Sequence, residues 1–222
     1  MSILSIKNVS YTYENTKHPV LKDINIDFEL GKVYCIIGKS GSGKTTFLSL
    51  LSGLDVCTRG NILCDGKDLG KSNRDDYRAH EIGVIFQGYN LLLNKTAYEN
   101  IELSMSISKA KHQNKRQYIL KLLESVGINK TTAFRKVLKL SGGEQQRIGI
   151  ARALSHDPNI ILADEPSGNL DHETEDEIMK ILVNLAHEQN KCVIIVTHSK
   201  KVTKCADEIW SMNKGKLTYA GS

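Results

Sequence analysis

The feature that most restricts how this chain can fold is the segment GKSGSGKT at residues 38–45. It matches the phosphate-loop pattern G-x-x-x-x-G-K-[ST], in which glycines let backbone N–H groups turn inward around phosphates. An apolar run, Val33 to Ile37, precedes it, and a helix is expected over residues 45–52. A helix that begins at the loop directs the positive end of its dipole at bound phosphates. These flanks predict an α/β fold with a nucleotide-binding loop, and they argue against a glycine-rich turn that matches by chance.

Two side chains of the loop have separate expected roles. Lys44 would place a positive charge beside the β- and γ-phosphates of a nucleoside triphosphate, which makes it a catalytic candidate as well. The Thr45 hydroxyl would bind Mg²⁺, which bridges those phosphates and offsets charge that develops in the transition state. The expected nucleotide-binding residues of this region are Gly38, Ser40, Gly41, Ser42, Gly43, Lys44, Thr45 and Thr46.

Four apolar runs are expected to be parallel strands that are covered on both faces. Ligands of a doubly wound sheet bind at the carboxyl ends of its strands, so these four ends would converge on one site. Polar residues often follow strands without any functional role, which would explain any one of these ends but explains the four in combination poorly. The expected strands are Val33 to Ile37, Ile82 to Phe86, Asn159 to Ala163 and Cys192 to Thr197, followed by Gly38, Gln87, the pair Asp164 and Glu165, and His198.

The remaining patterns predict a single domain with two additions to the parallel core. Residues 3–30 alternate between apolar and polar, which predicts an antiparallel β subdomain. The pattern becomes helical over residues 88–155; within it, the apolar positions of residues 119–126 have helical spacing and Gly127 suits a C-terminal cap. We therefore expect a P-loop NTPase core with a mostly parallel sheet. One domain would span 1–222, with a RecA-like core and its antiparallel subdomain at 1–87 and 156–222 and an inserted helical subdomain at 88–155.

Composition excludes several classes of protein. With 40% hydrophobic and 25% charged residues, the chain is typical of globular proteins rather than of disordered, collagen-like or coiled-coil chains. Its net charge of +5 permits an anionic partner but selects none. Five cysteines with no C-x-x-C pair support neither a disulfide framework nor a four-ligand zinc site. No signal peptide pattern and no apolar run of about 18 residues occurs, so action at a membrane would require another chain.

Asp164 and Glu165 follow an apolar strand pattern directly. Because neighbouring side chains of a strand point in opposite directions, the two carboxylates are expected to have different roles. Asp164 suits the metal, either directly or through water, and Glu165 suits orienting or deprotonating an attacking water. A helix cap or a solvated turn is the alternative for such a pair, and the phosphate loop favours the catalytic role.

The segment LSGGEQQR at residues 140–147 opens a predicted helix. Ser141 and Glu144 have the spacing of a capping box. Capping does not explain Gly142 and Gly143, because a glycine in a helix costs up to ~1 kcal/mol relative to alanine. Close approach of a bulky anion to the backbone would explain both glycines. The sequence therefore predicts a second phosphate-binding helix end.

Taken in order along the chain, these motifs resemble the nucleotide-binding subunit of ATP-binding cassette (ABC) transporters. The resemblance covers essentially the whole chain, and the combination is highly specific, whereas the phosphate loop alone leaves kinases and GTPases open. Residues 89–92, 96–101 and 163–171 are most similar to the lipoprotein-release, macrolide and antimicrobial-peptide exporter group. The motifs are the phosphate loop, Gln87, LSGGEQ, ILADEP at 161–166, SGNLD at 167–171 and Thr197-His198.

This resemblance implies a head-to-tail homodimer that forms with ATP. Each of two ATP molecules would lie between the phosphate loop of one subunit and the helix that opens with LSGGEQ at residues 140–145, the signature helix, of the other. Ser141 and Gly143 would reach the γ-phosphate across the interface, with Gly142 and Glu144 beside them as nucleotide-contacting candidates. Asp171 would help to couple the two sites.

The resemblance also implies roles for residues around the phosphates. Gln87 would contact Mg²⁺ and the attacking water and move with the helical subdomain, and His198 would hold the γ-phosphate and orient that water. Tyr13 would stack on adenine, with Tyr11 as a competitor. The catalytic set is then Glu165, His198, Gln87 and Lys44, and the Mg²⁺ set is Thr45, Gln87 and Asp164.

Three positions depart from common usage in the family. Lys39 stands where proline is frequent, Ser167 stands for the usual threonine, and Ser199 follows His198 where aspartate is common. None of these changes removes a catalytic atom. Ser199 leaves open how His198 is braced.

The expected function is that of a Mg-dependent ATPase that powers a separately encoded transmembrane permease from the cytoplasmic face of the membrane, exporting or extracting a peptide, lipoprotein or drug-like substrate. No nucleic-acid partner is expected, since the basic residues of 109–121 lack interleaved aromatics and favour a solvated helix face. The alternatives are an ABC-like ATPase that acts on DNA or ribosomes, and a small-molecule kinase. The first needs a long coiled coil or two cassettes, and the second has no use for the LSGG segment.

Overall fold

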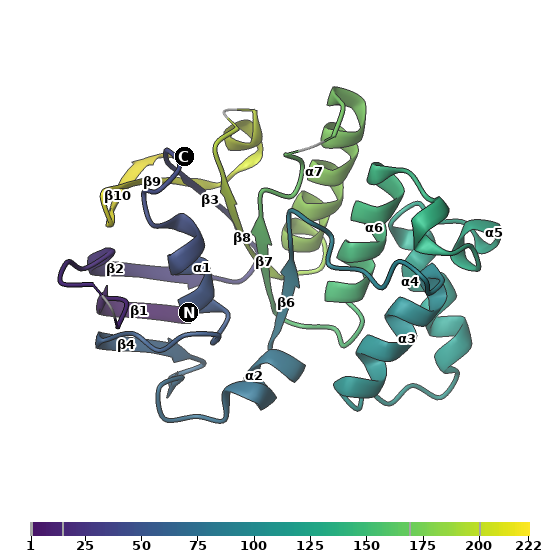
Figure 1. Cartoon of the computed structure of the whole chain (residues 1–222), viewed down its shortest axis with the longest axis horizontal. Coiled ribbons are helices and arrows are strands. Elements are labelled where there is room, and N and C mark those ends of the chain that lie inside the picture. Colours follow the sequence, from purple (N-terminus) through teal and green to yellow (C-terminus); the bar gives the residue numbers. More distant parts are fainter. Residues whose placement is uncertain (1, 15, 169, 200) are drawn as a thin grey trace.

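Two sheets and a group of helices make up the computed structural model, which describes residues 2–14, 16–168, 170–199 and 201–222 (Figure 1). The larger sheet has the strand order β10-β9-β3-β8-β7-β6. β3, β6, β7 and β8 run parallel to their neighbours, and β9 is parallel to β3, while β10 is antiparallel to β9. The bounds are β3 Val33–Ile37, β6 Ile82–Ile85, β7 Ile160–Asp164, β8 Cys192–Thr197, β9 Glu208–Asn213 and β10 Lys216–Gly221.

The four predicted parallel strands are therefore present in one sheet. β3 and β8 have the predicted bounds, β6 ends one residue earlier, and β7 is shifted by one residue so that it includes Asp164. Their register aligns Ile37 with Thr197, and Asp164 with Val196. Because these residues close their strands on the same edge, the segments that follow β3, β7 and β8 begin side by side.

The smaller sheet is antiparallel, as predicted, and has the order β2-β1-β4-β5. The alternation of residues 3–30 is explained by its single buried face, on which Leu4, Ile6, Ile24 and Ile26 lie. Val20 precedes β2 rather than belonging to it. The bounds are β1 Ser2–Tyr11, β2 Leu21–Glu29, β4 Arg59–Cys64 and β5 Lys67–Asp68.

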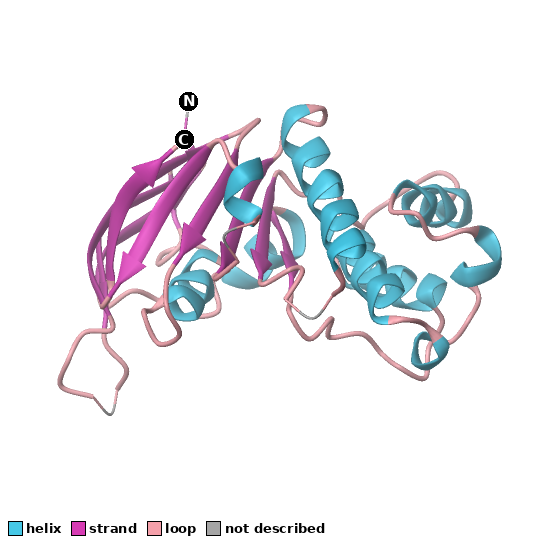
Figure 2. Ribbon diagram, turned by 90° about the horizontal axis from the view of Figure 1, so that it is seen from above, coloured by secondary structure: helices cyan, strands magenta, loops and turns pink. Residues whose placement is uncertain are grey.

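Helices cover both faces of the larger sheet and extend to one end of the molecule, away from the strands (Figure 2). The predicted cap is present, since α4 is followed by Gly127 with φ +80°. Residues 109–114 are exposed loop rather than helix, with Ala110 half-buried, and α4 begins only at Lys115. The bounds are α1 Lys44–Leu51, α2 Arg74–His80, α3 Ala97–Ile107, α4 Lys115–Ser125, α5 Lys130–Ala133, α6 Gly142–Ala153 and α7 His172–His187, with 3₁₀ turns at Val137–Lys139 and Val202–Cys205.

The core consists of two apolar clusters, one on each face of the larger sheet. Val33 and Cys35 of β3 belong to the cluster that also holds apolar residues of α3, α4, α6 and α7, whereas Tyr34 and Ile36 belong to the cluster that holds residues of α1 and the antiparallel sheet. The helices of residues 88–155 thus share their apolar cluster with one sheet face. The subdomain boundaries at 87/88 and 155/156 stay a prediction. None of the helices in the described ranges is both long enough and apolar enough to span a bilayer.

Candidate functional site

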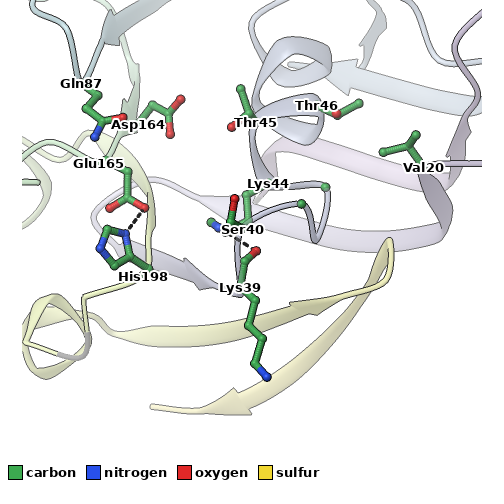
Figure 3. A pocket seen from close by; sticks show the side chains of 12 residues that line it. Val20, Lys39, Ser40, Lys44, Thr45, Thr46, Gln87, Asp164, Glu165 and His198 are labelled. Atoms are coloured by element: carbon green, nitrogen blue, oxygen red, sulfur yellow. Dashed lines mark hydrogen bonds and ion pairs between the residues drawn. The ribbon is translucent and has the colours of Figure 1, made fainter.

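A cavity of about 660 Å³ lies where the carboxyl ends of the parallel strands meet the start of α1 (Figure 3). One wall comes from the phosphate loop, α1 and Val20, and it includes Lys39, Ser40, Gly41, Gly43, Lys44, Thr45 and Thr46. The facing wall comes from the ends of β6, β7 and β8, and it includes Gln87, Asp164, Glu165 and His198. The predicted convergence of four strand ends is therefore present in the structure.

The conformation of the loop depends on its glycines. Gly41 and Gly43 have φ of +74° and +112°, which side chains disfavour. A Cβ on Gly38 would lie 2.4 Å from the carbonyl oxygen of Met212. The Lys44 ammonium bends back over the loop and donates to the carbonyl oxygens of Gly38 at 2.8 Å and Lys39 at 3.3 Å. The Lys44 ammonium can therefore leave these two carbonyl oxygens when a stronger acceptor, such as a phosphate oxygen, enters the cavity.

The N-terminus of α1 fits an anionic ligand. Its N-cap, Gly43, has no side-chain hydrogen bond, and no acidic residue lies in its first turn. Each of the other α-helices in the described ranges has a side-chain N-cap, from Asn73, Thr96, Asn114, Asn129, Ser141 and Asp171. The first N–H groups of α1 therefore face the cavity with the helix dipole and without an internal acceptor, which suits phosphate.

Asp164 and Glu165 both line the cavity, which corrects the expectation that their side chains point in opposite directions. The strand ends at Asp164, and Glu165 has φ +46°, so strand alternation no longer applies to it. Burial raises the pKa of Asp164, the neighbouring negative charge of Glu165 adds to this effect, and Lys44 opposes it. A cation at this wall would relieve the cost of the ionised Asp164.

Glu165 is held by two donors. Thr197 Oγ1 donates to Oε2 at 2.7 Å, and His198 Nδ1 donates to Oε1 at 2.7 Å. The Glu165 N–H donates to the carbonyl oxygen of Val196 at 2.8 Å. Thr197 is a site residue that was not among the predicted ones, although its place at the end of β8, next to His198, was a usable signal.

Thr45, Gln87 and Asp164 offer a hydroxyl, an amide and a carboxylate around the cavity. No group of three or more His, Cys, Asp or Glu side chains that could hold a metal occurs within the described ranges. An all-protein cage is not what Mg²⁺ usually has, because it retains several waters and takes one or two carboxylates plus phosphate oxygens. The donor set therefore fits Mg²⁺ that arrives with a nucleotide.

The two candidate aromatics differ in exposure. Tyr11 is buried and packs edge-on against Tyr13, with ring centroids 5.0 Å apart. Tyr13 is 44% exposed, and its hydroxyl is hydrogen-bonded to Thr46 Oγ1 at 2.9 Å. Of the two, Tyr13 is the exposed one and contacts α1 through Thr46, which supports it as the stacking residue.

The start of the signature helix, residues 140–147, lies outside the cavity of its own chain. Ser141 and Glu144 form the predicted capping box at the start of α6. A Cβ on Gly142 would lie 3.0 Å from the Tyr89 hydroxyl oxygen, and one on Gly143 would lie 2.7 Å from Thr174 Cγ2. The glycines therefore also have a packing reason, which adds to the argument from anion approach.

Asp171 also lies outside the cavity lining, as the N-cap of α7. It accepts hydrogen bonds from the Thr174 N–H at 3.0 Å and from Thr174 Oγ1 at 2.9 Å. The Thr174 bonds, the backbone one first, lower the pKa of Asp171. Asn169, part of the SGNLD motif, lies outside the described residues.

A parallel sheet, a glycine loop that leads into an uncapped helix, and a facing pair of carboxylates define a phosphate-loop nucleoside triphosphatase. Comparison with known proteins makes this class specific. Residues 21–168 match the ABC transporter family. The chain belongs to this family and is an ABC transporter ATP-binding subunit with ATPase activity.

Several relatives are similar over nearly their whole length. The chain is 47% identical to the uncharacterized ABC transporter ATP-binding protein YclH of Bacillus subtilis, over 98% of this chain and 96% of YclH. It is 39% identical to the lipoprotein-releasing system ATP-binding protein LolD of Francisella tularensis, over 97% and 95%. The solved dimeric MJ0796 cassette has a TM-score of 0.89 and 34% identity, over 98% of both chains. MJ0796 has also been solved as a post-hydrolysis dimer bound to ADP and Pi.

Proposed function

We propose that two copies of this chain bind two ATP molecules between them, head to tail, and hydrolyse them. The observation that carries the proposal is the separation of the two predicted phosphate-binding helix ends. α1 begins at the cavity, whereas the N-terminus of α6 lies elsewhere, with Ser141 exposed. In a head-to-tail pair, Ser141, Gly142, Gly143 and Glu144 of one subunit would close the cavity of the other. The dimeric MJ0796 cassettes support this arrangement.

Binding would use groups that the loop already presents. The Lys44 ammonium would exchange two carbonyl acceptors for the β- and γ-phosphate oxygens, which are stronger acceptors because they are charged. The α1 N–H groups would bind the same phosphates, and Tyr13 would stack on adenine. Thr45, Gln87 and Asp164 would hold Mg²⁺, which supplies neutralisation of the phosphate charge.

Hydrolysis would use Glu165 as the general base for an in-line water. Each of its carboxylate oxygens accepts one hydrogen bond and retains capacity for another, so Thr197 and His198 can orient it without blocking it. The water oxygen would attack the γ-phosphorus and give a proton to Glu165, while the bond from the γ-phosphorus to the β,γ-bridging oxygen breaks. Lys44, His198 and the partner subunit's signature helix would stabilise the charge that spreads in the transition state.

Glu165→Gln tests both the base and the dimer. Turnover should fall by at least ~10²-fold, because a general base contributes about that much, while ATP binding persists. The variant saturated with Mg-ATP should also form a dimer in light scattering. Glu188→Gln, an exposed residue at the far end of α7, is the matched control and should keep wild-type turnover. Turnover within a few-fold of wild type would refute the base, and a persistent monomer at high concentration, alone and with the permease, would refute the dimer.

We also propose that residues 87–101 dock to a separately encoded permease and hold the subunit at the cytoplasmic face of the membrane. Leu92 and Leu93 are about half exposed there. The Leu138 N–H donates to the Leu93 carbonyl oxygen at 3.0 Å, which adds the 65% exposed Leu138 to the same surface. We call Leu92, Leu93 and Leu138 the docking face. Exposed apolar residues in a cluster are typical of protein contacts.

The transported substrate would be a peptide, lipoprotein or drug-like molecule that is exported or extracted. This follows from the similarity to LolD and from the exporter-like residues 89–92, 96–101 and 163–171. The test is the ATPase rate of the subunit reconstituted with the membrane protein encoded beside it. Stimulation by a lipopeptide supports the proposal, and stimulation only by a sugar or an amino acid contradicts it.

A further inference from the structure

A carboxylate outside the cavity lies between the segments that carry two of the proposed catalytic residues. Glu175 sits in the first turn of α7 and is only 9% exposed. Its Oε1 accepts from Ser167 Oγ at 3.0 Å and from Ser199 Oγ at 3.4 Å. Ser167 lies two residues after Glu165, and Ser199 directly follows His198. One oxygen atom therefore joins the segment after β7 to the segment after β8.

These bonds complete a ring around the catalytic pair. Thr197 and His198 both donate to Glu165, and the Ser199 N–H donates to Thr197 Oγ1 at 3.0 Å. On the other side, the Gly168 N–H donates to the Glu165 carbonyl oxygen at 3.1 Å. The path from Glu165 through β8 and Ser199 thus returns through Glu175 and Ser167. A shift of either segment would change the orientation of the Glu165 carboxylate.

Basic side chains near Glu175 favour its ionised form, which accepts hydrogen bonds. Lys201 Nζ lies 3.7 Å from Oε2, and His172 Nδ1 lies 3.8 Å from the same oxygen. The Lys201 ammonium also pairs with Asp176 at 2.7 Å, so it is shared between two carboxylates. A carboxylate that is nearly buried needs such partners, because isolated burial of a charge is costly.

Ser167 and Ser199 are also two of the three positions at which the chain departs from common family usage. An aspartate, the frequent residue at position 199, would bring its own carboxylate to the place where Ser199 now donates to Glu175. Two carboxylates there would repel each other. A serine at position 199, which can donate a hydrogen bond, is therefore compatible with a glutamate at position 175, whereas an aspartate at 199 is not.

We propose that Glu175 is a positioning residue for ATP hydrolysis, which holds the Glu165 and His198 segments in register and replaces a carboxylate that would otherwise come from position 199. The proposal rests on the proposed roles of Glu165 and His198. It assigns no direct contact between Glu175 and nucleotide, and it concerns the chemical step rather than ATP binding, since the phosphate loop and α1 lie on the facing wall.

The test is a two-residue cycle in the full-length protein, with kcat and KM for ATP measured for each variant. Glu175→Ala should lower kcat at least roughly fivefold, as loss of about one buried hydrogen bond predicts, with KM changed less than twofold. Ser199→Asp alone should also lower kcat, because it places two carboxylates together. The double variant Glu175→Ala with Ser199→Asp should recover most of the wild-type kcat. Glu188→Ala removes the same charge from the other end of α7 and should leave both constants unchanged.

Several results would overturn the proposal. One is a kcat for Glu175→Ala within twofold of wild type, and another is a double variant whose losses simply multiply. If Glu175→Ala unfolds at a clearly lower temperature, the isosteric Glu175→Gln decides. Wild-type kcat is then expected to within about threefold, because Gln keeps an oxygen acceptor for both serines. A larger loss in this folded variant also contradicts the proposal. Failure of Glu165→Gln to lower turnover would instead refute the assignment of the base, so the two failures can be told apart.

Discussion

At the scale of single residues, the site depends on how two adjacent carboxylates are made different. Asp164 closes β7, is half-buried and has a raised pKa, whereas Glu165 leaves the strand through a positive φ and is held by Thr197 and His198. Burial and a neighbouring negative charge act on Asp164, whereas Glu165 accepts two side-chain hydrogen bonds. These different environments fit Asp164 for binding a metal and Glu165 for orienting a water molecule.

The raised pKa of Asp164 has a consequence for stability. Ionised Asp164 is less favourable in the folded chain than in the unfolded chain, so it destabilises the nucleotide-free protein at neutral pH. This destabilisation should be lost as the pH falls through the folded-state pKa, which lies above the ordinary value. Asp164→Asn should therefore raise the unfolding temperature at pH 7, by less at pH 4.5, and should lower ATPase activity at least ~10²-fold if Asp164 holds Mg²⁺.

Thermal unfolding of wild type and variant at the two pH values checks this prediction. Asp27→Asn is the control, because Asp27 is exposed on β2 and lies outside the cavity, so the unfolding temperature should change little at either pH. An Asp164→Asn protein that is less stable than wild type at pH 7 would show that ionised Asp164 is already compensated in the nucleotide-free protein.

At the scale of elements, the N-termini of α1 and α6 differ in how they are capped. α1 starts without a side-chain cap at the cavity, whereas α6 starts with a complete capping box and two glycines. The α6 glycines have two explanations that act at the same place: tight packing against Tyr89 and Thr174, and close approach of a partner's nucleotide.

A pair of variants separates these explanations. Gly143→Ala should destabilise the fold by about 1–3 kcal/mol, since the new methyl group would overlap Thr174 Cγ2. Adding Thr174→Ser removes that methyl and keeps the hydroxyl bond to Asp171, so stability should return, and alanine should add up to ~1 kcal/mol through helix propensity. Chemical denaturation measures both.

ATPase activity should stay low in the double variant, because the added methyl still blocks the approach of phosphate to the helix end. Thr174→Ser alone is the control and should retain activity. Full activity in the stable double variant would mean that packing alone explains Gly143.

At the scale of the whole molecule, the cavity lies at the carboxyl ends of the parallel strands, and the helices of residues 88–155 lie on one side of the larger sheet (Figure 1). The docking face belongs to the loop before α3 and to the 3₁₀ turn Val137–Lys139. Gln87 is a cavity residue that directly precedes residue 88, where the helical subdomain is predicted to begin. Its position supports the proposal that movement of the helical subdomain changes the contacts of Gln87 at the site.

Charge placed on the docking face should separate transport from hydrolysis. Leu93→Glu with Leu138→Glu should weaken association with the permease at least ~10-fold, because burying an unpaired charge at an interface is costly, and should abolish transport. The basal ATPase rate and the unfolding temperature should change little, since both side chains are already exposed. Co-purification and vesicle transport assays measure the two effects.

Ile107→Glu is the matched control, because Ile107 is 69% exposed at the end of α3, away from the paired segments of residues 93–95 and 137–138. It should leave association and transport intact. Normal transport by the Leu93 and Leu138 variant would contradict the docking face.

Much of the fold could be predicted from local signals. β3 and β8 are buried β-branched runs with few competing conformations, and their bounds match the prediction. The cap at Gly127 and the capping box at Ser141 also depend on neighbours only a few residues away. The loop at 109–114 was predicted as helix, because charge patterning shows exposure but does not define where a helix begins.

The chemistry of the chain was determined by the sequence alone: a loop that only glycines can form, a lysine at its end, and acids and a histidine that follow apolar strands. Only the tertiary structure decided how those groups act together. It set the positive φ that turns Glu165 toward the cavity. It also brought the Thr197 hydroxyl to Glu165, and the Glu175 carboxylate to Ser167 and Ser199, in contacts between residues 8 to 32 positions apart. Contacts over such separations depend on strand order and register, which the spacing of residues along one chain does not contain.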